Sequence, residues 1–301
     1  MPVRSQTPVI RPVAFNGRQF ESLGVEVTTW QQLHQVESKV EYQTGERPQF
    51  YILMLITGGQ GSHSIDFQCH HLEVGDAVWV KPGQSQHWSP NPGMQAELLF
   101  ISPQAMPLVQ CDEDELEQIA LDRWPTHHKL ERQQWYTLAR QLRLLRREQI
   151  QAPAEPLSLL FQRSTVLAVL AKLAHVYRAE ILNPHEPQQR VYHQFGRLLE
   201  ANFAQRRSVV FYAAQLACSA STLNRLCRSL TGLSAKQTID RRVALEAKRL
   251  LSQQVLSVSQ IAYQLGFSEP TNFVKFFRRM ERLSPKAFRQ ERISGAPKQR
   301  Q

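Results

Sequence analysis

The chain has 301 residues, of which 42% are hydrophobic and 21% are charged, a composition typical of globular rather than disordered proteins. This length allows about two domains. The longest uninterrupted apolar run, at 50–56, is far shorter than the roughly 18 residues that span a bilayer. The N-terminus also shows no secretory signal pattern. We therefore expect a cytoplasmic protein with no membrane partner.

The formal net charge of +10 is concentrated at one end of the chain. Residues 1–110 carry a net charge of −3, residues 111–187 carry −1, and residues 188–301 carry +14. Segregated positive charge favours a polyanion as a partner, because each Lys or Arg that docks on a phosphate releases a condensed counterion. Charge alone leaves open a basic surface that only keeps the protein soluble.

The cysteines show no spacing suited to a metal site or to a disulfide framework. There are four, none of them in a CxxC pair: Cys69, Cys111, Cys218 and Cys227. We expect them to be reduced, mostly buried and without a catalytic role, because no neighbour in sequence would lower a thiol pKa.

The first third of the chain contains short segments typical of β-strands. They are rich in β-branched and aromatic residues and are bounded by turn signals such as TGGQG at 57–61. The segments are GVEVTTW (24–30), FYILMLI (50–56), HSIDF (63–67), AVWV (77–80) and AELLFI (96–101). Short strands at this spacing predict a small β barrel or sandwich within residues 1–110.

From residue 111 to residue 182 the pattern becomes helical. Apolar residues recur at three- and four-residue intervals in segments 112–124, 132–148 and 156–182. The last segment is apolar around most of its circumference and must therefore be buried. Packing on the β domain would cover one face, and we expect a second copy of the chain, in a homodimer, to cover another.

The segment NPHEPQQ, residues 183–189, places two prolines among polar residues and is typical of a linker. Residues 190–292 are helical in short pieces, and we expect residues 293–301 to be disordered. The predicted fold class is thus α+β, with an N-terminal β barrel plus dimerisation helices and an all-α C-terminal domain.

The basic C-terminal domain contains an internal repeat. RLCRSLTGLSAK (225–236) aligns with KFFRRMERLSPK (275–286) at an offset of 50 residues. AAQLA (213–217) aligns with AYQLG (262–266) at an offset of 49 residues. Each copy is therefore predicted to form a helix, a tight turn and a second helix.

Local signals mark the ends of these helices and the connection between the copies. In the second copy Ser257 or Ser259 can cap the first helix, and Gly266 sits where a left-handed residue is favoured. Residues 241–254 contain no Pro or Gly and predict a rigid central helix. If it sets the two second helices about 34 Å apart, both can enter successive major grooves.

The second helix of each copy has one apolar and one polar face. Leu223, Leu226 and Cys227 should face inward in the first copy, and Phe273, Phe276 and Phe277 in the second. The outward residues are Ser221, Thr222, Asn224, Arg225 and Arg228 in the first copy, and Thr271, Asn272, Lys275, Arg278 and Arg279 in the second. Their guanidinium and amide groups suit base edges, Arg for guanine and Asn for adenine.

Four segments resemble the signature of the AraC/XylS family of bacterial transcription regulators: SASTLNRLCRSLTG, EAKRLL, SVSQIAYQLGFSEPTNFVKFFRR and LSPKAFR. The resemblance covers residues 194–292 and implies two helix-turn-helix units joined by a central helix. It also implies double-stranded promoter DNA and RNA polymerase as partners. By motif position, base contacts are expected from Ser221, Asn224, Arg225, Thr271, Asn272 and Lys275. Phosphate contacts are expected from Thr222, Arg228, Arg278, Arg279 and Lys286.

The sequence departs from the family pattern at three positions. Arg282 stands where the family commonly has Gly, Cys227 where it has an aromatic residue, and Val243 where it has Arg. An arginine held in the left-handed conformation would cost about 1 kcal/mol. We expect looser packing of the first unit and an intact DNA-facing side.

The N-terminal strands resemble the cupin-like sensor domains often fused in this family. GDAVWVKPGQSQHWSPN (75–91) is similar to the second cupin motif, with His87 at its histidine position. A metal cupin needs an HxH pair and a Glu that this sequence does not supply, so we expect no metal or other cofactor. His87 would then be structural or a hydrogen-bonding pocket residue. Trp30, Trp79 and Trp88 could line a pocket for an unknown small-molecule effector, or could pack in the core.

These features predict a dimeric, effector-responsive transcription regulator, and the resemblance favours an activator. Effector binding would shift the DNA-binding equilibrium by a few kcal/mol. One alternative is an enzyme, either a cupin dioxygenase or a DNA-alkyl repair protein; the incomplete metal triad and the lack of a PCHR-like cysteine motif count against these. The other alternative is an architectural DNA-binding protein without effector control.

Overall fold

The computed structural model describes residues 11–13, 24–36, 45–89, 93–103, 105, 119, 121–151, 155–177 and 187–293. The chain divides into two compact units, with residues 11–181 in the first and residues 182–301 in the second. Each unit is described by itself. Three features of the sequence lie outside the described residues: Cys111, the acidic start of the first helical segment at 112–118, and the tail from residue 294 onward.

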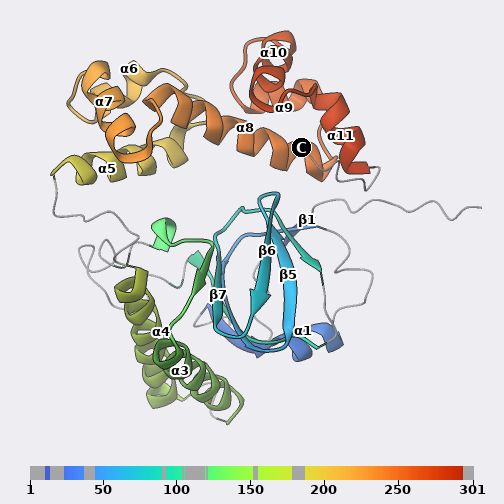
Figure 1. Ribbon diagram of the computed structural model, residues 1–301, viewed down its shortest axis with the longest axis vertical. Helices are drawn as coiled ribbons and strands as arrows, with labels where there is room; N and C mark the ends of the chain where they lie inside the picture. Colours follow the sequence, from blue (N-terminus) through green and yellow to red (C-terminus); the bar gives the residue numbers. More distant parts are fainter. Residues whose placement is uncertain are drawn as a thin grey trace, which may run out of the picture. The chain divides into compact units, whose positions relative to one another are not determined.

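The first unit is built from two five-stranded sheets around an apolar interior (Figure 1). One sheet has the order β1-β3-β8-β5-β6 and the other β10-β7-β4-β9-β2. The strands are β1 (Arg11–Val13), β2 (Val25–Thr29), β3 (Glu46–Pro48), β4 (Tyr51–Gly58), β5 (Gln60–Ile65), β6 (Gln68–Glu73), β7 (Asp76–Val80), β8 (Gln86–Ser89), β9 (Gln95–Ile101) and β10 (His127–Lys129). All five predicted strand segments contain a strand, which confirms the predicted cupin-like barrel.

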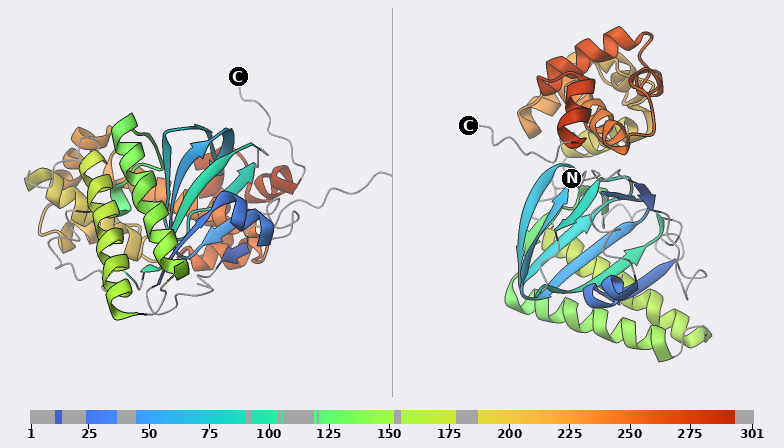
Figure 2. Two further views of the ribbon diagram at one scale, coloured as in Figure 1. Left: turned by 90° about the horizontal axis from the view of Figure 1, so that it is seen from below. Right: turned by 90° about the vertical axis from the view of Figure 1, so that its right-hand side faces the viewer.

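Alternation along the strands separates two apolar cores. Ile52, Met54 and Val78 point between the two sheets, together with Trp30 at the start of helix α1 (Trp30–Val36). The opposite face of β4, β7 and β9 carries, among others, Leu53, Leu55, Ala77, Trp79 and Leu99. Helices α3 (Arg132–Gln151) and α4 (Pro156–Tyr177) lie side by side over that face (Figure 2). The predicted helix at 132–148 is observed, the one at 156–182 is observed as far as Tyr177, beyond which residues 178–182 are not described, and both pack on the sheet as expected.

Within the segment predicted as a helix at 112–124, the structure describes only residue 119 and residues 121–124. Ile119 is α-helical, Leu121–Arg123 form a short 3₁₀ helix, η2, and β10 follows to pair with β7. Pro125 cannot continue a helix. Ile119, Leu121 and Trp124 are buried in the core under α3 and α4, which explains their apolar spacing.

Helix α4 is long and apolar enough, by length and composition, to cross a membrane. The sequence prediction of no membrane span did not identify this helix, because charged and polar residues interrupt its apolar runs. One stripe of α4 is fully buried against α3 and the sheet, including Val166, Val169, Leu170 and Leu173.

The second unit is entirely helical in its described part. Its helices are α5 (Pro187–Asn202), α6 (Val209–Gln215), α7 (Ala220–Thr231), α8 (Ala235–Gln253), α9 (Val258–Gln264), α10 (Pro270–Glu281) and α11 (Pro285–Ile293). Helix α5 begins inside the segment 183–189 that was predicted as a linker, because a proline is well suited to the first turn of a helix. Helix α8 runs between the group α5–α7 and the group α9–α11 (Figure 1).

Candidate DNA interface

The structure confirms the internal repeat and its register. Helices α6 and α9 start 49 residues apart, at Val209 and Val258, and helices α7 and α10 start 50 residues apart, at Ala220 and Pro270. Helices α6 and α7 form one helix-turn-helix unit, and helices α9 and α10 form the other. Helix α8 joins the two units and is buried around much of its circumference, so it is the core of the domain as well as its spacer.

Serine side chains define the starts of several of these helices. Ser219 Oγ accepts a hydrogen bond from the backbone N–H of Thr222 and caps α7. Ser234 forms a capping box with Gln237 at α8, and Ser257 forms one with Gln260 at α9. The cap of α9 is therefore Ser257 and not Ser259. These caps satisfy otherwise unpaired N–H groups and fix where each helix begins.

The buried and exposed faces of α7 and α10 match position by position. Leu223, Leu226 and Cys227 are buried in α7, and their counterparts Phe273, Phe276 and Phe277 are buried in α10, as predicted. Exposed side chains occupy the other face: Ser221, Thr222, Arg225 and Arg228 in α7, and Thr271, Asn272, Lys275, Arg278 and Arg279 in α10. The two helices therefore present two equivalent polar surfaces.

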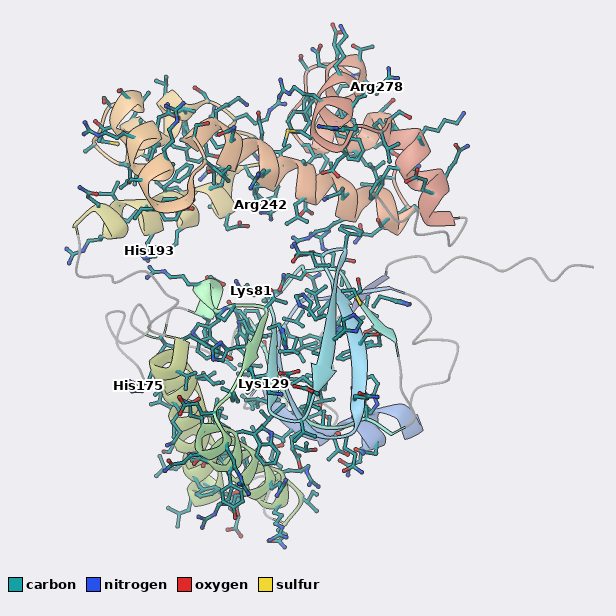
Figure 3. The ribbon with its side chains drawn as sticks, viewed as in Figure 1. Lys81, Lys129, His175, His193, Arg242 and Arg278 are labelled. Carbon is teal, nitrogen blue, oxygen red and sulfur yellow. The ribbon has the colours of Figure 1, made fainter. Side chains whose placement is uncertain are left out.

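Four cations on these surfaces are free to meet an anion. Arg225 and Arg228 of α7, and Lys275 and Arg278 of α10, are exposed and pair with no other side chain in the described part of the chain. Figure 3 shows Arg278 on α10. Lys286, at the start of α11, is likewise exposed and unpaired among described residues. Unpaired guanidinium and ammonium groups of this kind bind phosphate or guanine edges.

The structure corrects the role of Asn224. Its Nδ2 donates to the carbonyl oxygen of Ala220 at 3.0 Å, and its Oδ1 accepts from the backbone N–H of Ala235 at 3.1 Å. The side chain is half-buried between α7 and the start of α8. Its amide is thus engaged within the domain rather than presented to a base edge.

Two of the predicted phosphate ligands are also engaged. Arg279 Nη2 lies 3.2 Å from Oδ2 of Asp240, a buried carboxylate of α8 that also pairs with Lys236. This ion pair ties α10 to α8. The Thr222 hydroxyl lies 2.9 Å from that of the capping residue Ser219. We therefore assign Arg279 and Thr222 to positioning the helices.

The two units end their second helices in the same conformation with different residues. Gly232 follows α7 with φ 72°, and Arg282 follows α10 with φ 58°, so both are left-handed. The predicted left-handed conformation of Arg282 is confirmed. The backbone of Arg282 is therefore strained in the folded domain, since only glycine adopts the left-handed region without a steric cost.

Only two of the four predicted effector-pocket residues face the barrel interior. Trp30 and Trp88 lie there with ring centroids 4.7 Å apart. Trp79 points the other way, into the core under α3 and α4, where its Nε1 donates to the Leu121 carbonyl. His87 neighbours Trp88 on β8 and, by strand alternation, lies on the opposite face of the sheet. The pocket assignment of Trp79 and His87 is therefore wrong.

The interior instead contains a histidine that sequence reasoning missed. His63 on β5 is fully buried and stacks on Trp88 at a centroid distance of 3.8 Å. Neither of its ring nitrogens makes a hydrogen bond of normal geometry to a described residue, although the neighbouring Gln86 side chain opposes the lowering of its pKa. Burial, followed by the neighbouring His70, lowers the pKa of His63 to about 3, so the ring is neutral at pH 7. The alternation of His63 with buried Ile65 in HSIDF was the available signal.

A second pair of polar residues shares this interior. Gln86 is buried on β8 and donates from Nε2 to Oε2 of Glu46 on β3 at 3.3 Å. Its Oε1 has no partner among the described residues. Buried polar atoms normally find a hydrogen-bonding partner, so the unpaired atoms of His63 and Gln86 indicate where a polar ligand can be held.

The described residues contain no cluster of three His, Cys, Asp or Glu side chains suited to a metal. The three described cysteines are free thiols, but only Cys227 is buried, whereas Cys69 is exposed and Cys218 is half-buried. The expectation that most cysteines lie in the core is therefore wrong for two of them. Burial, together with Cys218, raises the pKa of Cys227 to about 11 and keeps it protonated.

Comparison with known proteins matches both units. The family profile described as "AraC-like ligand binding domain" matches residues 39–209, and "Helix-turn-helix domain" matches residues 212–291. The chain is 25% identical over 244 residues to the HTH-type transcriptional activator RhaS of Enterobacter sp. (strain 638), covering 81% of this chain and 86% of that protein.

Two solved structures illustrate the similarity. ToxT from Vibrio cholerae O395 is 11% identical, with 91% of this chain and 99% of that chain covered and a TM-score of 0.43. A transcriptional regulator with an AraC-type DNA-binding domain from Chromobacterium violaceum is 25% identical, with 36% and 96% covered and a TM-score of 0.33. On the extent of the family match, the chain belongs to the AraC family of transcription regulators, with a ligand-binding domain followed by a helix-turn-helix domain that binds DNA.

Proposed function

We propose that this regulator reads a two-part DNA site with α7 and α10 and activates transcription when an uncharged polar effector occupies the barrel interior. The proposal that the protein reads DNA is supported by the exposed polar face that α7 and α10 share. On both helices this face includes unpaired cations. The curated relative is named as a transcriptional activator, which favours activation through RNA polymerase. Such a regulator would act in the cytoplasm.

The proposed contacts follow from position and chemistry. Residues in the N-terminal half of each exposed face would contact base edges: Ser221, Arg225, Thr271, Asn272 and Lys275. Phosphates would be contacted by Arg228 and Arg278, which lie further along α7 and α10, and by Lys286 in α11. A footprint on operator DNA found by genome-wide mapping of bound sites tests the assignment. Failure of the full chain to protect any specific site would contradict it.

The effector proposal rests on His63 and Gln86. The neutral imidazole offers one donor and one acceptor, the Gln86 carbonyl offers an acceptor, and the Trp88 ring supplies an apolar wall. These groups suit a neutral hydrogen-bonding molecule better than a carboxylate, because Glu46 lies beside them. The proposal assigns the barrel a binding role and no catalytic one. Isothermal titration with candidate neutral compounds should show binding that His63→Leu abolishes and that His71→Gln, at an exposed position, preserves.

We further propose that the hairpin end of α3 and α4 is the homodimer interface. Four large apolar side chains are exposed there: Ile150 (63%), Leu157 (79%), Leu160 (58%) and Phe161 (44%). Exposed apolar residues gathered in one place commonly mark a protein interface. Helix α4 is long enough to cross a membrane, but one side of it is buried against α3 and the sheet. We therefore favour a second copy of the chain as the partner that covers its exposed apolar residues.

Sedimentation velocity tests the dimer. Leu157→Glu combined with Leu160→Glu should convert a dimer to a monomer, because burying two unpaired charges in an interface is costly. Val74→Glu, at an exposed turn of the barrel, is the matched control and should leave the dimer intact. A wild-type chain that sediments as a monomer would refute the dimer while leaving the DNA assignment untouched.

A further inference from the structure

The segment that leads into the first helix-turn-helix unit contacts the second unit directly, in addition to the connection through α8. Arg207, in the connection between α5 and α6, donates from Nη2 to the carbonyl oxygen of Gly266 at 2.8 Å. Its Cζ atom also lies 3.6 Å from the ring centroid of Phe267. Gly266 and Phe267 belong to the turn between α9 and α10, so one arginine just before α6 reaches the turn of the second helix-turn-helix unit.

The same contact explains why residue 266 is glycine. A Cβ added to Gly266 would lie 2.3 Å from the carbonyl oxygen of Ala204, a distance that no folded chain accepts without movement. The left-handed turn alone does not demand glycine, because the equivalent residue of the first unit, Ala217, adopts φ 49° with a side chain. The close approach of the α5–α6 connection is therefore what excludes a side chain at 266.

The α5–α6 connection is itself fixed at several points. The Tyr212 hydroxyl donates to the Arg206 carbonyl at 2.7 Å. Arg242 of α8, shown in Figure 3, donates from Nε to both carboxylate oxygens of Glu200 at 2.9 Å. The Arg242 guanidinium also lies over Phe203, 3.8 Å from the ring centroid. A connection held on α6 and α8 in this way transmits the position of the first unit to the Gly266 turn.

These contacts define a brace made of Ala204, Arg207, Gly266 and Phe267. Helix α8 is tied to α7 through Asn224 and to α10 through Arg279, so both of these contacts run through α8. The brace adds a contact that does not pass through α8. We infer that the brace fixes the angle and separation of α7 and α10, and so determines which spacing between the two halves of a DNA site the regulator accepts. The inference rests on the proposed reading of DNA by both helices.

The test compares two variants that open the brace with two matched controls. Arg207→Ala removes the hydrogen bond and the ring contact, and Gly266→Ala forces Ala204 away. Arg206→Ala removes the neighbouring arginine, which contacts Phe211 of its own unit, and Ala217→Gly changes the equivalent turn of the first unit. Each full-length protein is used to select binding sites from random-sequence DNA, and affinity is then measured on the selected site with one base pair added or removed between its halves.

The wild type and both controls should select one spacing, and changing it by one base pair should weaken binding about tenfold or more, as a misplaced contact does. Arg207→Ala and Gly266→Ala should select the same half-site sequences at several spacings, with the penalty reduced to about threefold or less. A contact that served only stability would lower the melting temperature and leave the spacing penalty unchanged.

If folded Arg207→Ala keeps the spacing and penalty of the wild type, the brace does not set spacing and the inference is overturned. Should Gly266→Ala fail to fold, Arg207→Ala still decides, because it removes atoms without adding any. A wild type that selects a single half-site, or no site, would overturn the proposed reading by two helices and the inference with it.

Discussion

Asn224 Oδ1 accepts a hydrogen bond from the backbone N–H of Ala235 at 3.1 Å, which links α7 to the first turn of α8. The same amide donates to the Ala220 carbonyl within α7. At the equivalent place in α10 the chain has Val274, which cannot form this link. The first helix-turn-helix unit is therefore tied to the central helix by a polar contact that the second unit lacks.

Asn224→Ala should lower the free energy of unfolding by about 1–2 kcal/mol, because it leaves a backbone N–H of α8 without its partner. It should not change the DNA sequence that is selected from a random pool. Asn272→Ala is the comparison: its side chain is exposed and not engaged within the described chain, so we expect unchanged stability and altered sequence preference. Calorimetry of the full chain and sequence selection measure both effects, and a changed base preference in Asn224→Ala would restore its role as a base reader.

Arg225→Ala and Lys275→Ala should each weaken specific binding by about 1–3 kcal/mol and relax the sequence preference in one half of the site. Arg228→Ala and Arg278→Ala should weaken binding to all sequences and reduce the slope of log affinity against log salt by about one. Fluorescence anisotropy at several salt concentrations separates the two classes. Equal effects of all four variants on specific and unrelated DNA would show that none of them reads bases.

Arg282→Gly should stabilise the helix-turn-helix domain by about 1 kcal/mol, because glycine adopts the left-handed conformation at φ 58° without the steric cost that arginine pays. The repeat supplies the reciprocal variant, since Gly232→Arg places arginine at the equivalent position and should destabilise by a similar amount. Chemical denaturation followed by far-ultraviolet circular dichroism gives both values. A shift of the same sign in the two variants would contradict the strain argument.

The N-terminal domain should lose stability as the pH falls below 6.5. Burial lowers the pKa of His63 from 6.5 to about 3, so the unfolded chain takes up a proton in this interval while the folded chain does not. Folding is then disfavoured by up to about 1.4 kcal/mol for each pH unit, and above pH 6.5 the residue contributes no pH dependence. The five tryptophans all lie within residues 11–181, so their fluorescence reports this domain alone.

The matched variants isolate the contribution of His63. His63→Leu should remove most of the loss between pH 6.5 and pH 4, because leucine cannot take up a proton in either state. His71→Gln, at an exposed position on the neighbouring strand, should behave as the wild type does. Urea midpoints measured at pH 7.5, 6.0, 5.0 and 4.5 provide the comparison. Parallel curves for wild type and His63→Leu would rule out His63 as the source of acid sensitivity.

The local pattern of the sequence was sufficient for the architecture of the DNA-binding domain. The offsets of 50 and 49 residues, the inward set around Phe273 and Phe277, and the left-handed Gly266 and Arg282 all depend on residues close together in the chain. Helical periodicity, caps and turns are local, so a single sequence carries them. The barrel strands with strong apolar alternation were identified for the same reason.

Shorter and more polar elements were missed because neighbours distant in sequence create them. Strand β10, which the sequence did not predict, exists only as the partner of β7. The side chains of Asn224 and Arg279 look outward on a helical wheel, yet each finds a partner on α8. Periodicity gives the direction of a side chain from its own helix and does not say what another element places in its path.

The sequence by itself determined the class of protein, its division into a sensor and a basic DNA-binding domain, and which faces of α7 and α10 are polar, because charge segregation and periodicity are properties of the chain. The tertiary structure alone decided that His63 and not His87 lies inside the barrel, that Trp79 faces the helices, and that Arg207 reaches Gly266. Those relationships join residues on different elements, and only packing brings them within range of one another.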